Sequence, residues 1–166
     1  IEDLQKQKEI EKQTLIEKQR FETLMKYASD GVFILSIDGQ VVECSNEAAR
    51  MLGYSMKEMK KLYVYDWDVN HTKEESLKSI RETPYVKITF DTKYKRKDAS
   101  VYDASITAVR ILINNVEYIY ASVRDVTEKK QIQQEILFQK EQQESLLSLF
   151  DKGDANIFKW NNDANW

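Results

Sequence analysis

The side chains with the clearest potential for chemistry are a single cysteine and a single histidine. Cys44 has no second cysteine for an internal disulfide, and it cannot build a four-cysteine zinc site. It ends a predicted strand, so we interpret it as a small packing residue in a reducing compartment. His71 lies in the polar sequence Asn70-His71-Thr72. That context is typical of a solvated helix start, and the alternative is an axial haem ligand.

The acidic pair around Trp67 is the most unusual local group in the sequence. Asp66 and Asp68 could hold a polar or cationic ligand against the indole ring. They could equally accept backbone N–H groups in short turns while Trp67 covers the core. The sequence leaves both interpretations open.

Several patterns argue against an enzyme. No serine or cysteine nucleophile lies in a recognisable motif that would use the histidine, and the four glycines form no phosphate-binding loop. The carboxylates fall at helical spacings that are typical of solvated charge. We therefore expect a non-catalytic chain without a metal site.

The charge balance and hydropathy restrict the partners. A net charge of −3 provides no basic face for phosphate groups, so we expect no nucleic-acid partner. No apolar run is long enough for a membrane span or resembles a signal peptide, so we expect a cytoplasmic location and no membrane contact within this chain. The first residue is Ile, which suggests a piece of a longer protein whose anchor, if it has one, lies elsewhere.

Residues 29–126 predict one α+β domain. Two strands joined by an Asp38-Gly39 turn come first, at 32–37 and 40–44. The three helices that follow begin after capping residues and are expected at 47–52, 56–62 and 72–82. The closing strands are expected at 85–94, 100–113 and 116–125. The pattern predicts a five-stranded antiparallel sheet with the short helices on one face.

Two helices are expected to flank this domain. Residues 1–28 contain no Gly or Pro and repeat apolar residues only weakly, so they predict a dimer seam, a docked end at Phe21–Ala28, or both. Residues 127–150 predict one helix of a two-stranded coiled coil. Its seam consists of Ile132, Ile136, Gln139, Gln143, Leu146 and Phe150. We therefore expect a homodimer through the flanking helices.

The junction at Asp125 joins the last strand to the exit helix without a flexible linker. Asp125 stands three residues before Glu128, which is close to a capping box in which the carboxylate accepts a first-turn N–H group. A shift of the sheet would then rotate the helix or break its first hydrogen bonds. We expect Asp125 and Thr127 to relay a signal, and the alternative is a purely local helix cap.

Four motifs of the sequence together resemble a PAS domain, the sensor fold of bacterial signalling proteins. In order, they are Asp38-Gly39, Asn46, Gly53-Tyr54-Ser55 and Asp125-Val126-Thr127. The resemblance spans about residues 21–130 and departs from the family pattern at Ala99, where many relatives carry Gly. It implies an internal ligand site and an output domain farther along the same chain, of the histidine kinase or diguanylate cyclase type.

In a PAS-like fold the ligand lies between the sheet and the short helices, so strand alternation assigns the cavity lining. The candidate ligand-binding residues are Trp67, at the mouth, and Phe90, Tyr102, Ile106, Ile119 and Ala121. The small side chains of this face either leave space for a ligand or let a helix pack closely.

The signatures of two PAS cofactors are absent from the sequence. A flavin photosensor carries a reactive cysteine in an Asn-Cys-Arg motif, which this chain lacks. A haem sensor usually has its axial histidine on the third helix, whereas His71 precedes that helix. The cofactor stays unknown, with neither haem nor flavin expected.

The end of the chain repeats its first strand region. Residues 149–166 align with residues 24–41, which places Ile157-Phe158 on Val32-Phe33 and Asp163 on Asp38. The repeat predicts that residues 151–166 begin a second PAS-like domain, and an unrelated tail is the alternative.

These observations predict a sensory or signal-relay module of a multidomain bacterial signalling protein. The alternative is a ligand-free PAS module for dimerisation or protein interaction.

Overall fold

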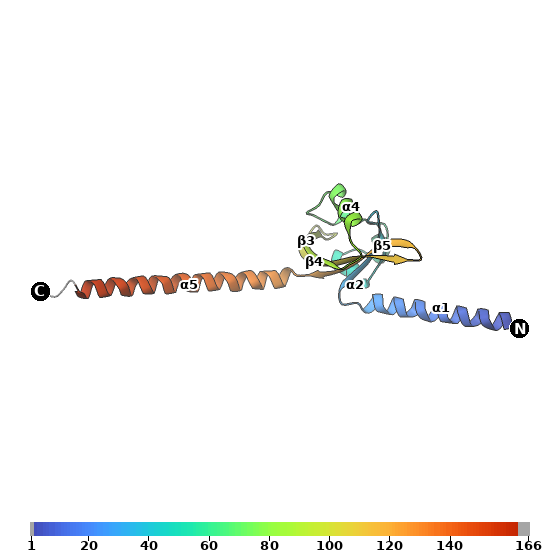
Figure 1. Ribbon diagram of the computed structural model, residues 1–166, viewed down its shortest axis with the longest axis horizontal. Helices are drawn as coiled ribbons and strands as arrows, with labels where there is room; N and C mark the ends of the chain where they lie inside the picture. Colours follow the sequence, from blue (N-terminus) through green and yellow to red (C-terminus); the bar gives the residue numbers. More distant parts are fainter. Residues whose placement is uncertain (1, 163–166) are drawn as a thin grey trace. The chain divides into compact units, whose positions relative to one another are not determined.

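The computed structural model describes residues 2–162, and the surroundings of side chains from residue 3 to residue 152. Figure 1 follows the chain from blue to red. The elements are α1 (Glu2–Tyr27), β1 (Gly31–Ser36), β2 (Val41–Cys44), α2 (Asn46–Leu52), α3 (Met56–Met59), the 3-10 helix η1 (Val64–Asp66), α4 (Lys73–Glu82), β3 (Ile88–Lys95), β4 (Val101–Ile113), β5 (Val116–Asp125) and α5 (Thr127–Asn162). The contacts between residues group the chain into two compact units, one that ends at Val126 and one that begins at Thr127.

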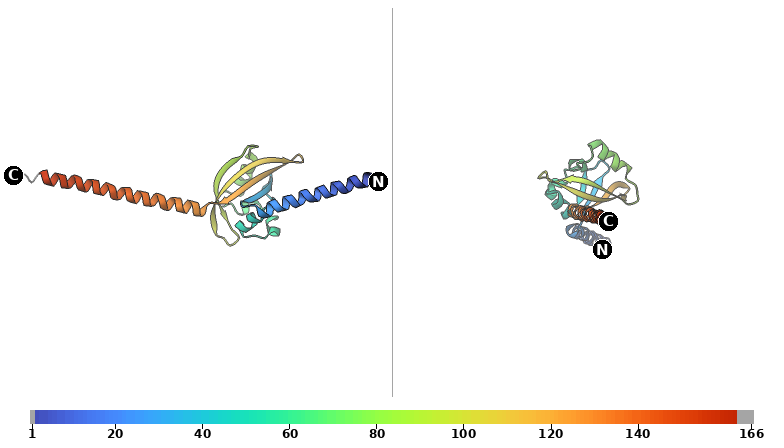
Figure 2. Two further views of the ribbon diagram at one scale, coloured as in Figure 1. Left: turned by 90° about the horizontal axis from the view of Figure 1, so that it is seen from below. Right: turned by 90° about the vertical axis from the view of Figure 1, so that its left-hand side faces the viewer.

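The five strands form one sheet in the order β2-β1-β5-β4-β3, with antiparallel neighbours. The predicted five-stranded antiparallel sheet is therefore confirmed. The first strand pairs with the last in the middle of the sheet, where Phe33 faces Ala121. The long β4–β5 hairpin, yellow to orange in Figure 2, turns at Asn114 and Asn115 with φ of 49° and 61°. Asparagine tolerates this left-handed backbone, as the two-residue hairpin requires.

Gly39 in the β1–β2 turn connects the start of the domain to its helices. Its φ is 84°, and a Cβ atom at this position would lie 2.9 Å from Ile80 Cδ1 and 3.1 Å from Val64 Cγ1. Only glycine combines this backbone with such a close approach. The turn thereby fixes how near α4 and η1 come to the sheet.

The helices begin at the predicted caps. Ser45 accepts the Ala48 N–H group at the start of α2, and α2 ends at Gly53 with φ 76°. Ser55 with Glu58 and Thr72 with Glu75 form complete capping boxes at α3 and α4. Each box satisfies amide groups that a short helix leaves unpaired. These local signals are sufficient to set where the short helices start.

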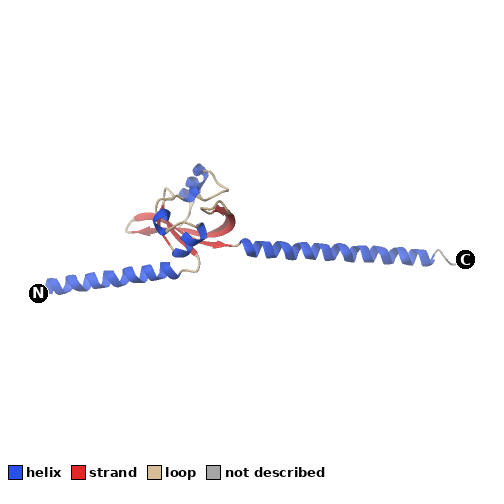
Figure 3. Ribbon diagram, turned by 180° about the vertical axis from the view of Figure 1, so that it is seen from behind, coloured by secondary structure: helices blue, strands red, loops and turns tan. Residues whose placement is uncertain are grey.

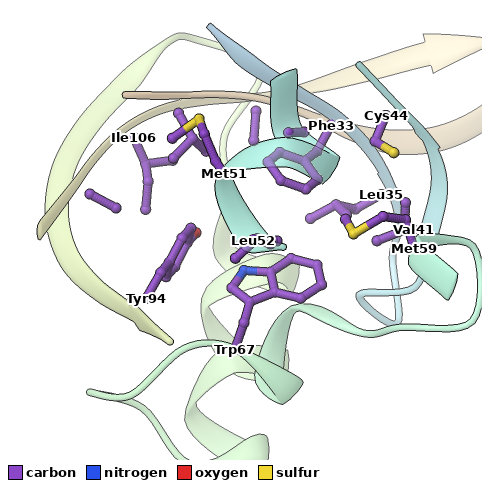
Figure 4. Packing of buried hydrophobic residues seen from close by; sticks show 14 of the residues in the cluster. Phe33, Leu35, Val41, Cys44, Met51, Leu52, Met59, Trp67, Tyr94 and Ile106 are labelled. Carbon is purple, nitrogen blue, oxygen red and sulfur yellow. The ribbon is translucent and has the colours of Figure 1, made fainter. Parts of the chain in front are cut away.

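One buried cluster joins the sheet to all the short helices. Figure 4 shows side chains of β1, α2, α3 and the β3–β4 pair that point toward one another around Trp67. The predicted inner face of β4 and β5 is buried in this cluster, at Tyr102, Ala104, Ile106, Ala108, Ile119, Ala121 and Val123. The helices therefore cover one face of the sheet, as expected for the α+β class.

The two terminal helices, blue at the chain ends in Figure 3, differ from the prediction in detail. In α1, which contacts α2, the side chains of Phe21, Leu24 and Tyr27 are 42%, 72% and 73% exposed. Docking of this end therefore buries little of its apolar surface.

The exit helix is longer than expected. It continues past residue 150 to Asn162, so Ile157-Phe158 lies in helix instead of the predicted strand. An isolated strand has no partner for its backbone groups here, whereas a helix satisfies them within the segment. Asp163 and the other residues after 162 lie outside the described part of the chain.

Candidate functional site

A cavity of about 60 Å³ lies where the inner face of the sheet meets α4. Ala108 and Ala121, which face each other across β4 and β5, form part of its floor. Their methyl groups leave space that larger side chains would fill. The remaining apolar lining comes from Leu35, Val64, Ile80, Phe90, Tyr94, Ile106 and Ile119.

The helical wall of the cavity carries hydroxyl groups. Ser76, Ser79 and Thr83 line it at spacings of three and four residues, so they share one face of α4 and its C-terminal cap. The Thr83 hydroxyl donates to the Ser79 carbonyl oxygen at 3.0 Å. The Ser76 hydroxyl is buried and has no hydrogen-bond partner among the described residues. The cavity therefore combines an apolar floor with one unsatisfied hydroxyl.

The rim of the cavity is an acid–imidazole pair. His71 Nδ1 lies 3.1 Å from Asp68 Oδ2, and the His71 side chain is 42% exposed while that of Asp68 is 9% exposed. Asp68 Oδ1 also accepts the Thr92 hydroxyl at 3.2 Å and the Asn70 N–H group at 3.0 Å. The nearly buried carboxylate is therefore satisfied within the protein, as burial of a charge requires.

Four of the six candidate ligand residues line this cavity: Phe90, Ile106, Ile119 and Ala121. Phe90 lies at the open side, with 38% of its surface exposed. Trp67 and Tyr102 lie elsewhere in the core. Their rings form an aromatic row through Tyr94, which has centroid distances of 6.2 Å to Trp67 and 5.9 Å to Tyr102. Burial raises the pKa of both tyrosines above the ordinary value.

The structure decides between the two interpretations of the acidic pair around Trp67. The indole is 2% exposed and stacks on Phe33 at a centroid distance of 5.5 Å. Asp66 accepts the Tyr63 N–H group at 2.8 Å, as a turn residue does. Trp67 thus covers the core, as the second interpretation has it, and lies away from the cavity mouth, because acidic neighbours do not say how deep the ring between them lies.

The size of the cavity limits what it holds in this conformation. Ligand pockets for drug-sized molecules have volumes of roughly 300–1,000 Å³. A cavity of about 150 Å³ accommodates benzene. At about 60 Å³ this one has room for a few waters or one very small molecule. A planar cofactor would need the α4 wall to move away from the sheet.

Sequence reasoning missed the polar side of the cavity. His71 was expected at a solvated helix start, and the hydroxyls of α4 were not considered. A signal was present, because Ser76, Ser79 and Thr83 repeat on the helix face that also carries the buried Ile80. A hydroxyl-rich stripe on the core side of an amphipathic helix marks a polar interior surface.

Cys44 lies in the core, as predicted. Its thiol is buried, with Sγ at 4.0 Å from Met56 Sδ. Desolvation raises its pKa to about 11. A thiol that stays protonated at neutral pH is a packing group and a poor nucleophile.

Arg110 holds the far end of the α4 wall. It follows Ala108 on the inner face of β4, and its side chain is only 14% exposed. The guanidinium donates to the carbonyl oxygens of Thr83 at 2.9 Å, Arg81 at 2.5 Å and Ile80 at 3.3 Å, and to Glu117 at 2.9 Å. A single side chain therefore satisfies the C-terminal carbonyls of α4 and ties them to β5.

The exit of the domain is marked by an ion pair. Arg96, directly after β3, places Nη2 2.7 Å from Asp125 Oδ2 at the end of β5. The guanidinium also lies 4.1 Å from the ring centroid of Tyr102 on β4 and donates to the Met51 carbonyl oxygen of α2. Arg96 therefore connects three strands and a helix at the last residue of β5.

The β3–β4 hairpin next to Arg96 is bound to the short helices as well. The Lys97 N–H group donates to the Leu52 carbonyl oxygen at 2.9 Å, and Lys97 Nζ lies 2.7 Å from Glu58 Oε1. The hydrogen bond from Lys97 lowers the pKa of Glu58 to about 2. The hairpin, the end of α2 and the start of α3 therefore form one connected group.

A polar hollow of about 440 Å³ lies beside this group, lined by residues that include Arg50, Arg96, Arg124 and Asp125. Its charges are paired internally, with Arg50 on Glu47 at 2.5 Å and Arg124 on Asp30 at 2.9 Å. These arginine hydrogen bonds lower the pKa of both carboxyl groups.

The exit helix, taken by itself, exposes a row of large apolar side chains. The predicted seam residues Ile132, Ile136, Leu146 and Phe150 are 50%, 61%, 56% and 72% exposed. Other apolar side chains beyond the predicted seam are exposed too: Leu137, Phe138, Leu147 and Leu149. Such a surface is typical of a helix that pairs with another helix.

Within residues 3–152, whose side chains the structure describes, no group of three or more His, Cys, Asp and Glu side chains could hold a metal ion. Among the helices of the described part of the chain, none has the length and apolar character to cross a membrane.

A family model described as PAS domain matches residues 29–128. No curated protein matches the sequence. The match covers both the cavity and the Arg96–Asp125 pair.

Solved structures share the fold at low sequence identity. The PAS domain of an HTR-like protein from Haloarcula marismortui is 22% identical, with a TM-score of 0.66 over 71% of this chain and 98% of that one. A PAS domain from a two-component sensor histidine kinase is 21% identical, with a TM-score of 0.58 over 68% of this chain and 98% of that one. A domain of a sensory box sensor histidine kinase/response regulator from Geobacter sulfurreducens is 14% identical, with a TM-score of 0.52 over 66% of this chain and 95% of that one.

Proposed function

The chain belongs to the PAS domain family, and from this premise we propose that it is a sensory and signal-relay module of a multidomain bacterial signalling protein. A ligand- or conformation-dependent change in the cavity passes through Asp125 and Thr127 into α5, and from there to an output domain in the same chain. The output domain is a sensor kinase or a diguanylate cyclase. This domain of the parent protein lies in the cytoplasm.

The observation that carries this proposal is the placement of the Arg96–Asp125 ion pair. Tyr94 lines the cavity two residues before Arg96, and Ala121 lines it four residues before Asp125. At roughly 3.3 Å per residue, both paths from cavity to ion pair are short and run along paired strands. A change in the spacing of the cavity walls therefore reaches the ion pair through stiff structure.

A homodimer through the flanking helices would give the relay its two states. The exposed seam of α5 pairs with its counterpart, while Gln139 and Gln143 weaken the middle of the seam. A pair with a polar middle is able to shift in register or rotation, whereas an all-apolar seam would lock it.

The cavity volume of about 60 Å³ favours one second candidate. The domain would then hold only water and serve as a ligand-free dimerisation or protein-interaction module. In that case the seam of α5 is the functional site, and the cavity is incidental.

Sedimentation equilibrium at micromolar concentration tests the dimer that both candidates need. We expect a dimer in the wild-type protein and weaker association in Leu146→Ala, because truncation of a seam leucine removes apolar contact. Glu141→Ala is the matched control, since Glu141 lies opposite the seam. A monomer, with no effect of Leu146→Ala, would contradict the proposal.

Native mass spectrometry of the same preparation separates the two candidates. A small molecule that is retained by the folded protein and lost on denaturation supports the sensor. A protein of unmodified mass in every preparation, together with an intact dimer, supports the ligand-free module.

A further inference from the structure

Ser76 gives the cavity a buried hydroxyl that has no hydrogen-bond partner among the described residues. A serine inside a helix normally bonds its hydroxyl to the carbonyl four residues earlier. Here the Thr72 carbonyl oxygen accepts the Ser76 N–H group at 2.9 Å, and Ser76 Oγ has no partner among the described residues. The residue is 5% exposed and lines the cavity. A buried, unpaired hydroxyl costs free energy, so the site favours a molecule that supplies the missing hydrogen bond.

The rest of the lining decides the charge of that molecule. No Lys or Arg lines the cavity in the described part of the chain, and the basic group that does line it, His71, already faces the Asp68 carboxylate at 3.1 Å, so an anion would find no free counter-charge. The single carboxylate, Asp68, already accepts Thr92 and Asn70 and lies 3.1 Å from His71 Nδ1. A cation would have to displace these partners. An uncharged molecule needs no counter-charge and displaces no partner of Asp68, so it avoids the free-energy cost of burying a charge.

The opposite wall and the volume decide its shape. Ala108 and Ala121 face the helix with methyl groups, and Ile106 and Ile119 flank them. A benzene-sized cavity of about 150 Å³ gives about two non-hydrogen atoms by proportion, and about 15 Å³ for each water-sized group gives about four, so a volume of about 60 Å³ fits roughly two to four.

We propose that the cavity binds a small uncharged molecule with one hydroxyl or carbonyl oxygen and a short apolar part, of the class of the short-chain alcohols. The Ser76 hydroxyl donates a hydrogen bond to the ligand oxygen, and the apolar part lies against Ala108 and Ala121. Ser76 is then the residue that selects a polar ligand over an apolar one. This inference rests on the sensory function proposed above, because it names the ligand class of that same cavity.

Titrations followed by amide chemical shifts test the inference, with propan-1-ol and xenon as probes. Xenon reports only that an apolar cavity is accessible. Propan-1-ol reports the hydrogen bond in addition. We expect both probes to produce saturable shifts in residues of α4, β4 and β5. Propylammonium has the same number of non-hydrogen atoms as propan-1-ol and propionate has one more, and both carry a charge, so we expect neither to bind.

Ser76→Ala isolates the hydroxyl. The variant should fold, because it removes a group without a partner. We expect its affinity for propan-1-ol to fall about 3- to 10-fold, which corresponds to one lost hydrogen bond, with unchanged xenon binding. Ser105→Ala, on the outer face of β4, is the matched control and should bind both probes like the wild-type protein.

The outcomes separate this inference from the proposed function. If xenon binds and Ser76→Ala leaves the propan-1-ol affinity unchanged, water satisfies the hydroxyl and the inference is wrong, while the cavity and the sensor remain. Binding of propionate as tight as that of propan-1-ol would overturn the uncharged class. If neither xenon nor propan-1-ol binds, the inference and the ligand-dependent form of the proposed function fail together.

Discussion

Arg96 Nη2 and Asp125 Oδ2 lie 2.7 Å apart across β4, with the ring of Tyr102 beneath the guanidinium. The pair joins the residue after β3 to the last residue of β5. It therefore fixes the end of the sheet two residues before the exit helix begins at Thr127.

Asp125→Ala should leave the domain folded but remove its control over the output. The two side chains are 27% and 34% exposed, so the lost ion pair costs about 1 kcal/mol or less. In the full-length parent we expect an output activity that no longer responds to the stimulus. Activity assays with and without the stimulus, beside a thermal melt, check this prediction.

Arg96→Gln is the matched variant for the same pair. If it responds like Asp125→Ala, the ion pair carries the signal. If Asp125→Ala itself melts slightly lower and still responds normally, Asp125 is only a local cap.

Arg110→Gln should weaken the α4 wall of the cavity. The variant leaves the carbonyl oxygens of Arg81 and Thr83 without the donor that now satisfies them, whereas the Ile80 carbonyl oxygen keeps the Thr83 N–H group at 3.2 Å. We expect a loss of about 1–3 kcal/mol in the free energy of unfolding, measured by urea denaturation. Arg81→Gln changes an exposed arginine of the same helix end and should cost far less. Equal stability of the two variants would mean that water replaces Arg110 at no cost.

Substitutions at Ala121 should report the size of the cavity. Ala121→Val adds two methyl groups beside a space of about 60 Å³, so we expect a change in melting temperature close to zero. Ala121→Trp exceeds that space and should overpack the core, at a cost of about 1–3 kcal/mol or more. Calorimetric melts compare the two. A tryptophan variant as stable as the wild-type protein would show a larger cavity than about 60 Å³.

Ala99→Gly should stabilise the β3–β4 turn. Ala99 has φ of 69°, a left-handed conformation that costs a residue with a Cβ atom about 1–2 kcal/mol. Glycine removes that strain but gains freedom in the unfolded chain, which offsets about 0.4–1 kcal/mol. We expect a net gain of roughly 0.5–1 kcal/mol in the free energy of unfolding. A loss of stability would mean that the turn does not need the left-handed backbone in solution.

The elements that could be predicted from the sequence are those that depend on near neighbours. Ser45, Ser55 and Thr72 cap helices through residues three positions away, so their patterns are visible in the chain itself. The inner faces of β4 and β5 follow from alternation alone. The departure at Ala99 was noted from the resemblance to PAS domains, and its φ of 69° is the left-handed backbone that glycine favours.

The parts that could not be predicted depend on distant partners. Alternation put Tyr102 on the correct face but could not show that Arg96 and Tyr94 cover it away from the cavity. Arg110 occupies an inner-face position whose partners are carbonyl oxygens about 30 residues away, which no local pattern encodes. The strand expected at Ile157-Phe158 was inferred from a repeat, and a repeat does not supply the partner strands that a sheet needs.

The central claim is that the state of the cavity reaches α5 in a homodimer. Its most direct test is the distance between spin labels on the two chains, placed by Glu141→Cys in a Cys44→Ala background. Filling the cavity with Ala121→Val serves as an occupancy mimic. We predict an interchain distance that shifts when the cavity is filled, and that no longer shifts when Arg96→Gln is added. Absence of an interchain distance, or the same distribution with the cavity open and filled, would contradict the account.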